Sequence, residues 1–147
     1  VDPSDHLNLC GLKIGVQTGT AQEDAIRADS AACTRASRPA IDMRSYSTQS
    51  EATTGLVGNV VDAIYSDSTV AGYAVELTDG QIVTLGEIED AAPQGVVTAK
   101  ADPQFTAAIQ AAIQYLMDQG IWQKILDNWG VKDAALTTAE LIPSVKE

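Results

Sequence analysis

The stretch LKIGVQTGTAQ, residues 12–22, changes midway from the pattern of a strand to that of a helix start. Its first five residues alternate between apolar side chains and Lys13 or Gly15, which is the two-residue period of a strand. Thr20 and Glu23 then have the spacing of a capping box, in which a hydroxyl and a carboxylate satisfy free N–H groups. We therefore predict a strand, a tight loop and a helix that ends before Pro39.

The same order of elements recurs along the next part of the chain. Strands are predicted at 41–43, 60–65 and 81–85, and helices at about 48–57 and from the capping residues 66–68 to about Glu76; residues 86–94 indicate a loop and 95–99 an extended stretch. Single strands that alternate with helices imply parallel pairing through right-handed crossovers. The predicted fold class is α/β, with one small doubly wound, mainly parallel sheet followed by C-terminal helices.

The C-terminal part has a helical pattern. Asp102 is a predicted N-cap with Pro103 at the first helical position, and apolar residues then recur on one face until a glycine ends the helix. A second apolar face lies at 121–129, and Thr137 with Glu140 offers a further capping box. Both apolar faces need a surface on which to pack.

Composition and charge argue against several classes of protein. The net charge of −11 disfavours nucleic acid and anionic membranes as partners, because both need clustered Lys and Arg. No apolar run approaches the roughly 20 residues that cross a bilayer. Cys10 and Cys33 fit neither a four-ligand zinc pattern nor a CxxC motif, so no metal and no cofactor are expected. From their number alone, a disulfide and two buried thiols are both open.

Two loops could bind a ligand, since ligands of such sheets lie beyond the carboxyl ends of the strands. The loop at 17–22 leads into a helix N-terminus, whose free N–H groups suit a carboxylate or a phosphate. The loop at 65–69 carries Asp67, which could accept hydrogen bonds from an ammonium group. Each loop could equally serve only to cap its own helix. Together they match the two ends of an α-amino acid.

Catalytic arrangements are not evident. The single histidine, His6, precedes the first strand and is expected in a mobile tail, so a triad or a Cys-His pair has no base. Glu87, Glu89 and Asp90 share one acidic loop, which we interpret as solvated surface. We assign no catalytic residue and predict that the protein is not an enzyme.

Four fragments in order resemble the family 3 solute-binding proteins, the polar-amino-acid receptors of ABC importers. They are LCGLKIGVQTGTAQ at 9–22, GNVVDAIYSD at 58–67, the stretch at 95–100 and the helices that end at 129–131. The resemblance implies a type II periplasmic-binding fold. It also implies that Thr20 and the backbone of Gly19, Ala21 and Gln22 meet the ligand α-carboxylate, and that Asp67 meets the α-ammonium.

The cysteines also resemble a pair found in a Gram-positive, especially actinobacterial, branch of this family. The resemblance therefore implies a Cys10–Cys33 disulfide and a location outside the cytoplasm, extracellular or periplasmic, with the full-length protein anchored as a lipoprotein.

The resemblance further implies a division of the chain into lobes. Residues 1–9 would be a linker or tail, 10–95 the second lobe, and 96–147 a return strand with C-terminal helices that belong to the first lobe. The rest of the first lobe, which supplies an arginine for the carboxylate and the aromatic walls, would be missing. We therefore expect weak or no binding by this chain alone, and C-terminal helices that pack on a second copy of the chain or in an abnormal place.

The predicted function is the substrate-binding component of an amino-acid importer, with an amino acid as ligand and the importer's membrane subunits as partners. Two alternatives stay open at this point, namely the sensor domain of a transmembrane receptor and a dehydratase-like enzyme on the same fold. The motifs do not specify which amino acid is bound.

Overall fold

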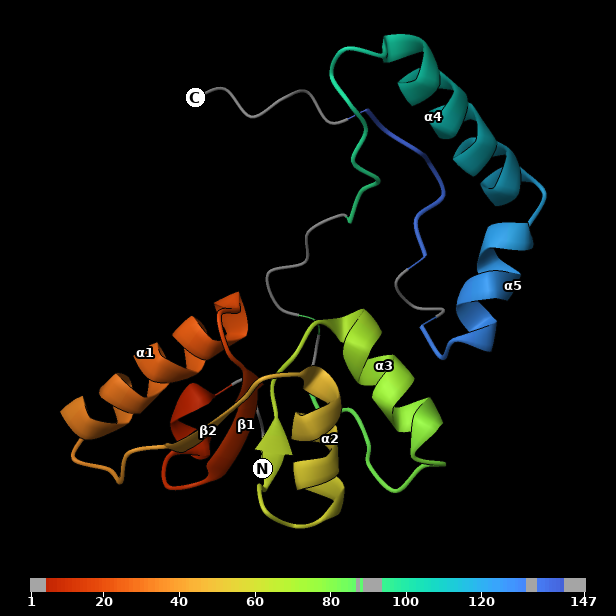
Figure 1. Ribbon diagram of the computed structural model, residues 1–147. Coiled ribbons are helices and arrows are strands. Elements are labelled where there is room, and N and C mark those ends of the chain that lie inside the picture. The colour runs from red at the N-terminus through yellow and green to blue at the C-terminus, as the bar shows by residue number, and fades with distance from the viewer. Residues whose placement is uncertain (1–4, 87, 89–93, 132–134, 142–147) are drawn as a thin grey trace. The chain divides into compact units, whose positions relative to one another are not determined.

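This computed structural model describes residues 5–86, 88, 94–131 and 135–141, and the chain forms two compact units (Figure 1). The first unit comprises residues 1–89 and the second residues 90–147. We describe each unit by itself. Within the described residues, no helix is long and apolar enough to cross a membrane.

The first unit contains a three-stranded parallel sheet (Figure 1). Strand β1 (Lys13–Gln17) lies between β2 (Asp42–Tyr46) and β3 (Ala63–Ile64). Lys13 is in register with Asp42, and Ile14 is in register with Ala63. Because each pair of strands is joined through a helix, the pairing is parallel, and the α/β fold class predicted from the sequence is confirmed.

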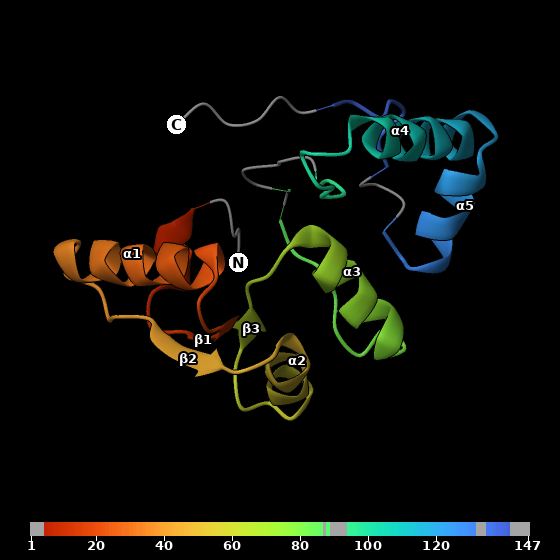
Figure 2. The same cartoon turned by 45° about the horizontal axis from the view of Figure 1, so that its top comes forward.

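Helices α1 (Ala21–Arg35) and α2 (Gln49–Val57) flank this sheet, and α3 (Ser68–Leu77) follows β3 farther from the strands, as Figure 2 shows. Helix α2 begins with a complete capping box between Thr48 and Glu51, and Asn59 follows it in the left-handed conformation with φ of 56°. Asparagine tolerates this conformation better than most residues, so it can close the turn into the third strand.

Successive residues of β1 face different layers. Ile14 and Val16 are buried in one cluster with Ile26 and Cys33 of α1. Gly15 points to the opposite face, where a Cβ would lie 3.0 Å from Ile64 Cγ2 and 3.2 Å from the Tyr46 ring. Side chains of a strand alternate between faces, so β1 has apolar bulk toward α1 and none toward Tyr46.

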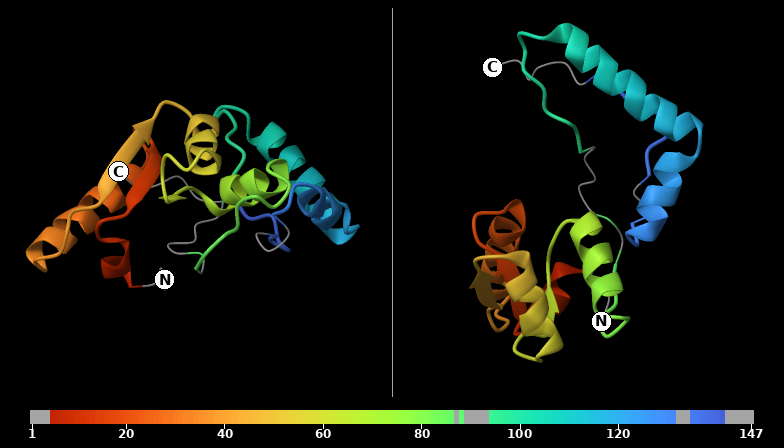
Figure 3. Two further views of the ribbon diagram at one scale, coloured as in Figure 1. Left: turned by 90° about the horizontal axis from the view of Figure 1, so that it is seen from below. Right: turned by 45° about the vertical axis from the view of Figure 1, so that its right-hand side comes forward.

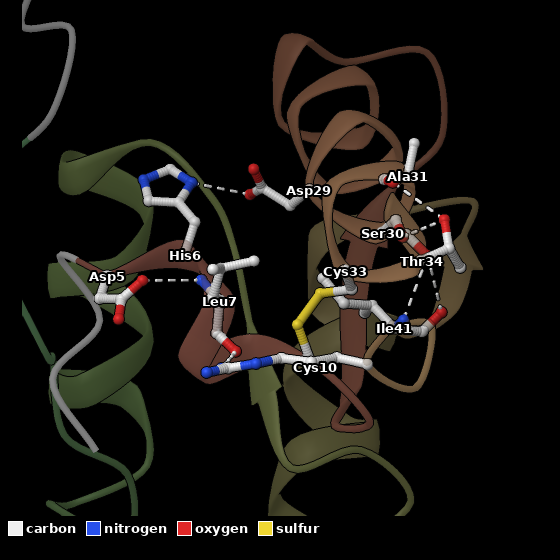
Figure 4. The surroundings of a disulfide bond; sticks show 11 residues. Asp5, His6, Leu7, Cys10, Asp29, Ser30, Ala31, Cys33, Thr34 and Ile41 are labelled. Atoms are coloured by element: carbon white, nitrogen blue, oxygen red, sulfur yellow. Dashed lines mark hydrogen bonds and ion pairs between the residues drawn. A yellow bond between two sulfur atoms is a disulfide. The ribbon is translucent and has the colours of Figure 1, made fainter. Parts of the chain in front are cut away.

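The segment before β1 is part of the first unit, which corrects the prediction of a free tail at His6. Residues His6–Leu9 form a short 3-10 helix, and Leu7 and Leu9 pack against the core cluster. The imidazole Nδ1 of His6 lies 2.9 Å from Asp29 Oδ2 (Figure 4). Cys10 and Cys33 form the disulfide that the family resemblance implied (Figure 4).

Two predicted strands differ from the structure. The strand expected at 60–65 is reduced to Ala63–Ile64, although Asp62 and Tyr65 also donate backbone hydrogen bonds to β1. The strand expected at 81–85 does not form, and Val83 and Leu85 there are about two-thirds exposed. A strand needs a neighbour for its backbone groups, and none of the described residues pairs with this segment.

The second unit contains α4 (Pro103–Asp118) and α5 (Ile121–Asn128), joined at Gly120 with φ of 66° (Figure 3). Asp102 caps α4 by accepting a hydrogen bond from Phe105 N at 2.9 Å, as predicted. The extended stretch at 95–99 has no paired strand among the described residues, so the predicted return strand is not formed there.

The capping-box spacing of Thr137 and Glu140 starts no helix within residues 135–141, and positions beyond them lie outside the described residues. Instead Gln114 of α4 binds this segment. Its amide oxygen accepts from Ala139 N at 2.8 Å, and its amide nitrogen donates to Thr137 O at 3.3 Å. Gln110 Nε2 also donates to Ala139 O at 2.8 Å, so side chains of α4 hold this non-helical segment.

Candidate ligand-binding site

The two loops singled out in the sequence follow β1 and β3. Since these strands are parallel neighbours, their carboxyl ends lie at the same edge of the sheet. The first loop leads into α1 and the second into α3. This edge therefore has two adjacent helix N-termini, which is where ligands of open α/β sheets bind.

Thr20 is the N-cap of α1, as predicted. Its hydroxyl accepts a hydrogen bond from Glu23 N at 3.3 Å and donates one to Gln17 O at 2.7 Å. The hydroxyl thus fixes the loop to the strand and starts the helix. The N–H groups of Ala21 and Gln22 lie in the first helical turn, where no earlier helical carbonyl is available to them. These two N–H groups can donate to an anion.

Glu23 completes the loop in a way that differs from the predicted capping box. Its Oε2 accepts from Gly19 N at 2.9 Å, one residue before the N-cap, and its Oε1 accepts from the Ser45 hydroxyl at 2.8 Å. The Gly19 N–H, followed by the Ser45 hydroxyl and with a smaller contribution from the charge of Arg27, lowers the pKa of Glu23. The Gly19 N–H is therefore engaged within the chain.

Gly19 itself has φ of 77°, and a Cβ at this position would meet no atom within 4 Å. Glycine is needed here for its backbone conformation and not for space. The four-residue spacing of Gly19 and Glu23 could have indicated the hydrogen bond between them, which we call the Gly19–Glu23 clamp. The hydrogen bond from Ser45 depends on the position of β2, so no nearby residue in the sequence indicates it.

Asp67 occupies the N-cap position of α3 but makes no capping hydrogen bond with its side chain. Its Oδ1 instead accepts from Gln22 Nε2 at 2.8 Å. This bond joins the two loops across 45 positions of sequence. Ser68 is the first residue of the helix and does not occupy the cap position.

The structure thus brings the predicted site residues to one edge of the sheet. Gly19, Thr20, Ala21 and Gln22 form the first loop, and Gln22 contacts Asp67 directly. Free N–H groups and the positive end of a helix dipole attract a carboxylate, while an exposed aspartate attracts an ammonium group. The arrangement can bind both charged ends of a small zwitterion.

A parallel α/β unit with a polar site at the carboxyl edge is shared by several classes of open-sheet fold, among them the periplasmic-binding-protein-like class. Comparison with known proteins makes this specific. No family model matches the chain. The chain is 36% identical over 138 residues to the arginine-binding protein ArgT of Corynebacterium glutamicum, which covers 93% of this chain and 45% of ArgT.

A solved structure of an ancestral arginine-binding protein bound to arginine superposes with a TM-score of 0.61 and 26% sequence identity. The match covers 84% of this chain and 53% of that one. The chain therefore spans about half the length of these two relatives. Both findings confirm the resemblance to the family 3 solute-binding proteins that the sequence motifs indicated, and both relatives are binding proteins.

Proposed function

We propose that this chain is part of the substrate-binding component of an amino-acid ABC importer, and that its ligand is L-arginine. The observation that carries the proposal is the 2.8 Å hydrogen bond between Gln22 and Asp67, which unites the two loops that would bind an α-amino acid. Arginine is chosen because both relatives are arginine-binding proteins by name.

In this proposal the ligand α-carboxylate lies at the start of α1. The N–H groups of Ala21 and Gln22 donate to it, and the helix dipole stabilises its charge. Thr20 holds the loop in place through its two hydrogen bonds. Because Glu23 already accepts from Gly19 N, that N–H contributes only if the ligand displaces the glutamate.

The ligand α-ammonium lies at Asp67. The amide of Gln22 donates to Oδ1 and so leaves Oδ2 of the carboxylate for the ligand. An ammonium–carboxylate hydrogen bond is charge-assisted and contributes about twice as much as a neutral one. Asp67 is exposed, so its contribution becomes large only when a second surface closes over the ligand and excludes water.

That second surface is the first lobe of the family, to which residues 96–147 are proposed to contribute while 10–95 form the second lobe. Closure of two lobes around the ligand would create the form that the importer's membrane subunits bind. The Cys10–Cys33 disulfide supports a location outside the reducing cytoplasm, extracellular or periplasmic. A lipoprotein anchor is part of the same proposal.

The test is calorimetric titration of each standard amino acid into two proteins, this chain and the product of the whole reading frame that encodes it. We expect arginine to bind the longer product far more tightly than this chain, which under this proposal has only part of the first lobe. Tight binding of a different amino acid by the longer product would replace arginine as the ligand. No binding of any amino acid would overturn the proposed function.

Two variants then assign the contacts. Asp67→Asn keeps the shape of the side chain but removes its charge, and should weaken arginine binding at least tenfold if the charged pair contributes about 1.5 to 3 kcal/mol. Asp79→Asn is the matched control, because Asp79 is also an exposed acid beside α3 and has φ of 51°, which asparagine tolerates. Equal affinities for the two variants would remove Asp67 from the site.

A further inference from the structure

A shallow groove of about 350 Å³ lies between α2 and α3. The two helices are neighbours that are inclined to each other in Figures 1 and 2. Val57 of α2 and Val70, Tyr73 and Leu77 of α3 supply its apolar walls. Leu77 is 64% exposed, Tyr73 42% and Val57 38%, so the walls keep much of their apolar surface in water. The groove contains none of the residues of the candidate ligand site.

The groove also contains an unsatisfied hydrogen-bond donor. Gln49, the first residue of α2, lines it, and its Nε2 is inaccessible to solvent with no hydrogen-bond partner among the described residues. A buried donor without an acceptor costs free energy, about 1 to 3 kcal/mol in proteins. Once the Gln49 side chain turns to expose this nitrogen, a carbonyl or hydroxyl oxygen of an occupant could accept from it and remove that cost.

The formal charges on the two helices and the turn after α3 have one sign. Glu51 lies on α2, Glu76 on α3 and Asp79 in the turn after α3, and these segments contain no Lys, Arg or His. Helices α2 and α3 have nine and ten residues, hence lengths of about 15 Å. An occupant of the groove would therefore lie within one or two Debye lengths of the acids on these helices. One Debye length is about 8 to 10 Å at physiological salt.

We propose that the α2–α3 groove is a docking surface for a cationic amphipathic helix of a partner protein. The groove between the two helices fits the apolar stripe of a helix of about ten residues. The basic face of the helix would be attracted by the surrounding acids, and one of its oxygens would accept from Gln49 Nε2. This surface is distinct from the loops proposed to bind the amino acid, so either proposal can fail without the other.

A designed peptide tests the surface directly. The probe is a helix of about 14 residues with Leu at positions i, i+3, i+4 and i+7 and Lys elsewhere, with some Ala. Its matched control replaces every Lys by Glu. Addition of the Lys peptide to the ¹⁵N-labelled chain should shift amide signals of residues 49–57 and 70–78, and added salt should weaken the effect. The Glu peptide should bind at least tenfold more weakly.

Two substitutions at the groove sharpen the test. Leu77→Asn removes part of the apolar wall without changing the charge, and should weaken Lys-peptide binding about tenfold. Its control is Val83→Asn, at a position that is 71% exposed and outside the groove, which should leave Lys-peptide binding unchanged. Gln49→Leu keeps the size of the side chain but removes the donor, and should weaken binding about three- to tenfold. All three sites are surface positions or helix ends, and circular dichroism checks that each variant folds.

Several results would overturn the proposal. Equal binding of the Lys and Glu peptides would remove the role of charge, and shifts spread over the whole acidic surface would remove the groove. Tighter binding by Gln49→Leu would show that the occupant offers no acceptor. Groove signals that change on dilution of the chain alone would identify a second copy as the occupant, and nuclear Overhauser contacts from residues 103–128 would identify the chain's own helices.

Discussion

The helices of the two units differ in what they bury. In the first unit, α1 places Ile26 and Cys33 against a parallel sheet, and both side chains are almost inaccessible to solvent. In the second unit, neither α4 nor α5 has a fully buried residue, although both have an apolar face. Amphipathic patterning and good caps therefore produce helices in both units, but only the first has a core among the described residues.

Stability should accordingly be concentrated in the first unit. Burial of apolar surface is the main favourable term in folding, and exposed hydrogen-bonded helices open locally at low free energy. The first unit also has the disulfide. This bond uses all the described cysteines, so the described residues of the second unit have none. Four predictions test this contrast, and they follow from the largest expected effect to the smallest.

Removal of the disulfide should have the largest effect. The double substitution Cys10→Ala and Cys33→Ala opens a loop with a sequence separation of 23, for which the chain-entropy estimate is about 3 kcal/mol of unfolding free energy. Urea unfolding measures this loss. Hydrogen exchange should speed up in β1 and α1 and stay unchanged in α4. Equal acceleration in α4 would show that the two units unfold together and would break the comparison.

The next effect concerns close packing on the face of the sheet opposite α1. Gly15→Ala adds a Cβ that would lie 3.0 Å from Ile64 Cγ2 and 3.2 Å from the Tyr46 ring, closer than ordinary contact. Overpacking of this kind costs about 1 to 3 kcal/mol, seen as a lower urea midpoint with unchanged slope. Gly95→Ala is the control, because a Cβ there meets nothing within 4 Å. Similar losses in both variants would contradict a packing cause.

Much of the first unit could be predicted from local patterns. The β1 strand, the Thr20 cap, the Thr48 helix start and the left-handed Asn59 all depend on residues within a few positions of each other. The strand at 81–85 could not be judged in this way, because a strand exists only with a partner, and its alternating residues are equally compatible with an exposed segment.

The candidate site shows the same limit. The two loops followed from strand ends and helix starts, but the Gln22–Asp67 bond joins residues 45 positions apart and has no local signal. The hydrogen bond from the Ser45 hydroxyl to Glu23 could not be predicted either, because it depends on how β2 lies beside β1. The anchoring of His6 was missed because a sequence near an end resembles a tail until its partner, Asp29, is placed.

The second unit should respond little to substitution at its apolar face when stability is measured. Ile125 is 40% exposed, so Ile125→Asn should change the unfolding free energy of the first unit by less than about 0.5 kcal/mol. Its effect should appear in association instead. If the apolar faces of α4 and α5 pack on a second copy, sedimentation will show a concentration-dependent dimer that Ile125→Asn weakens. A monodisperse monomer at all concentrations would contradict that association.

The smallest effect should be a pH dependence centred on Glu23. Its folded pKa is lowered from 4.5, mainly by the Gly19 N–H and then by the Ser45 hydroxyl. A carboxylate whose pKa is depressed on folding contributes stability that is fully present above its unfolded pKa and is lost as the pH falls through its folded value. Glu23→Gln should therefore lower stability at pH 7 and flatten its decline below about pH 4.5, the acid limb of the stability curve.

The control is Glu76→Gln at an exposed position of α3, which should leave the acid limb unchanged. An acid limb identical in wild type and Glu23→Gln would show that the Gly19–Glu23 clamp does not persist in solution. The start of α1 would then be held by Thr20 alone, and the Gly19 N–H would be available to the ligand carboxylate.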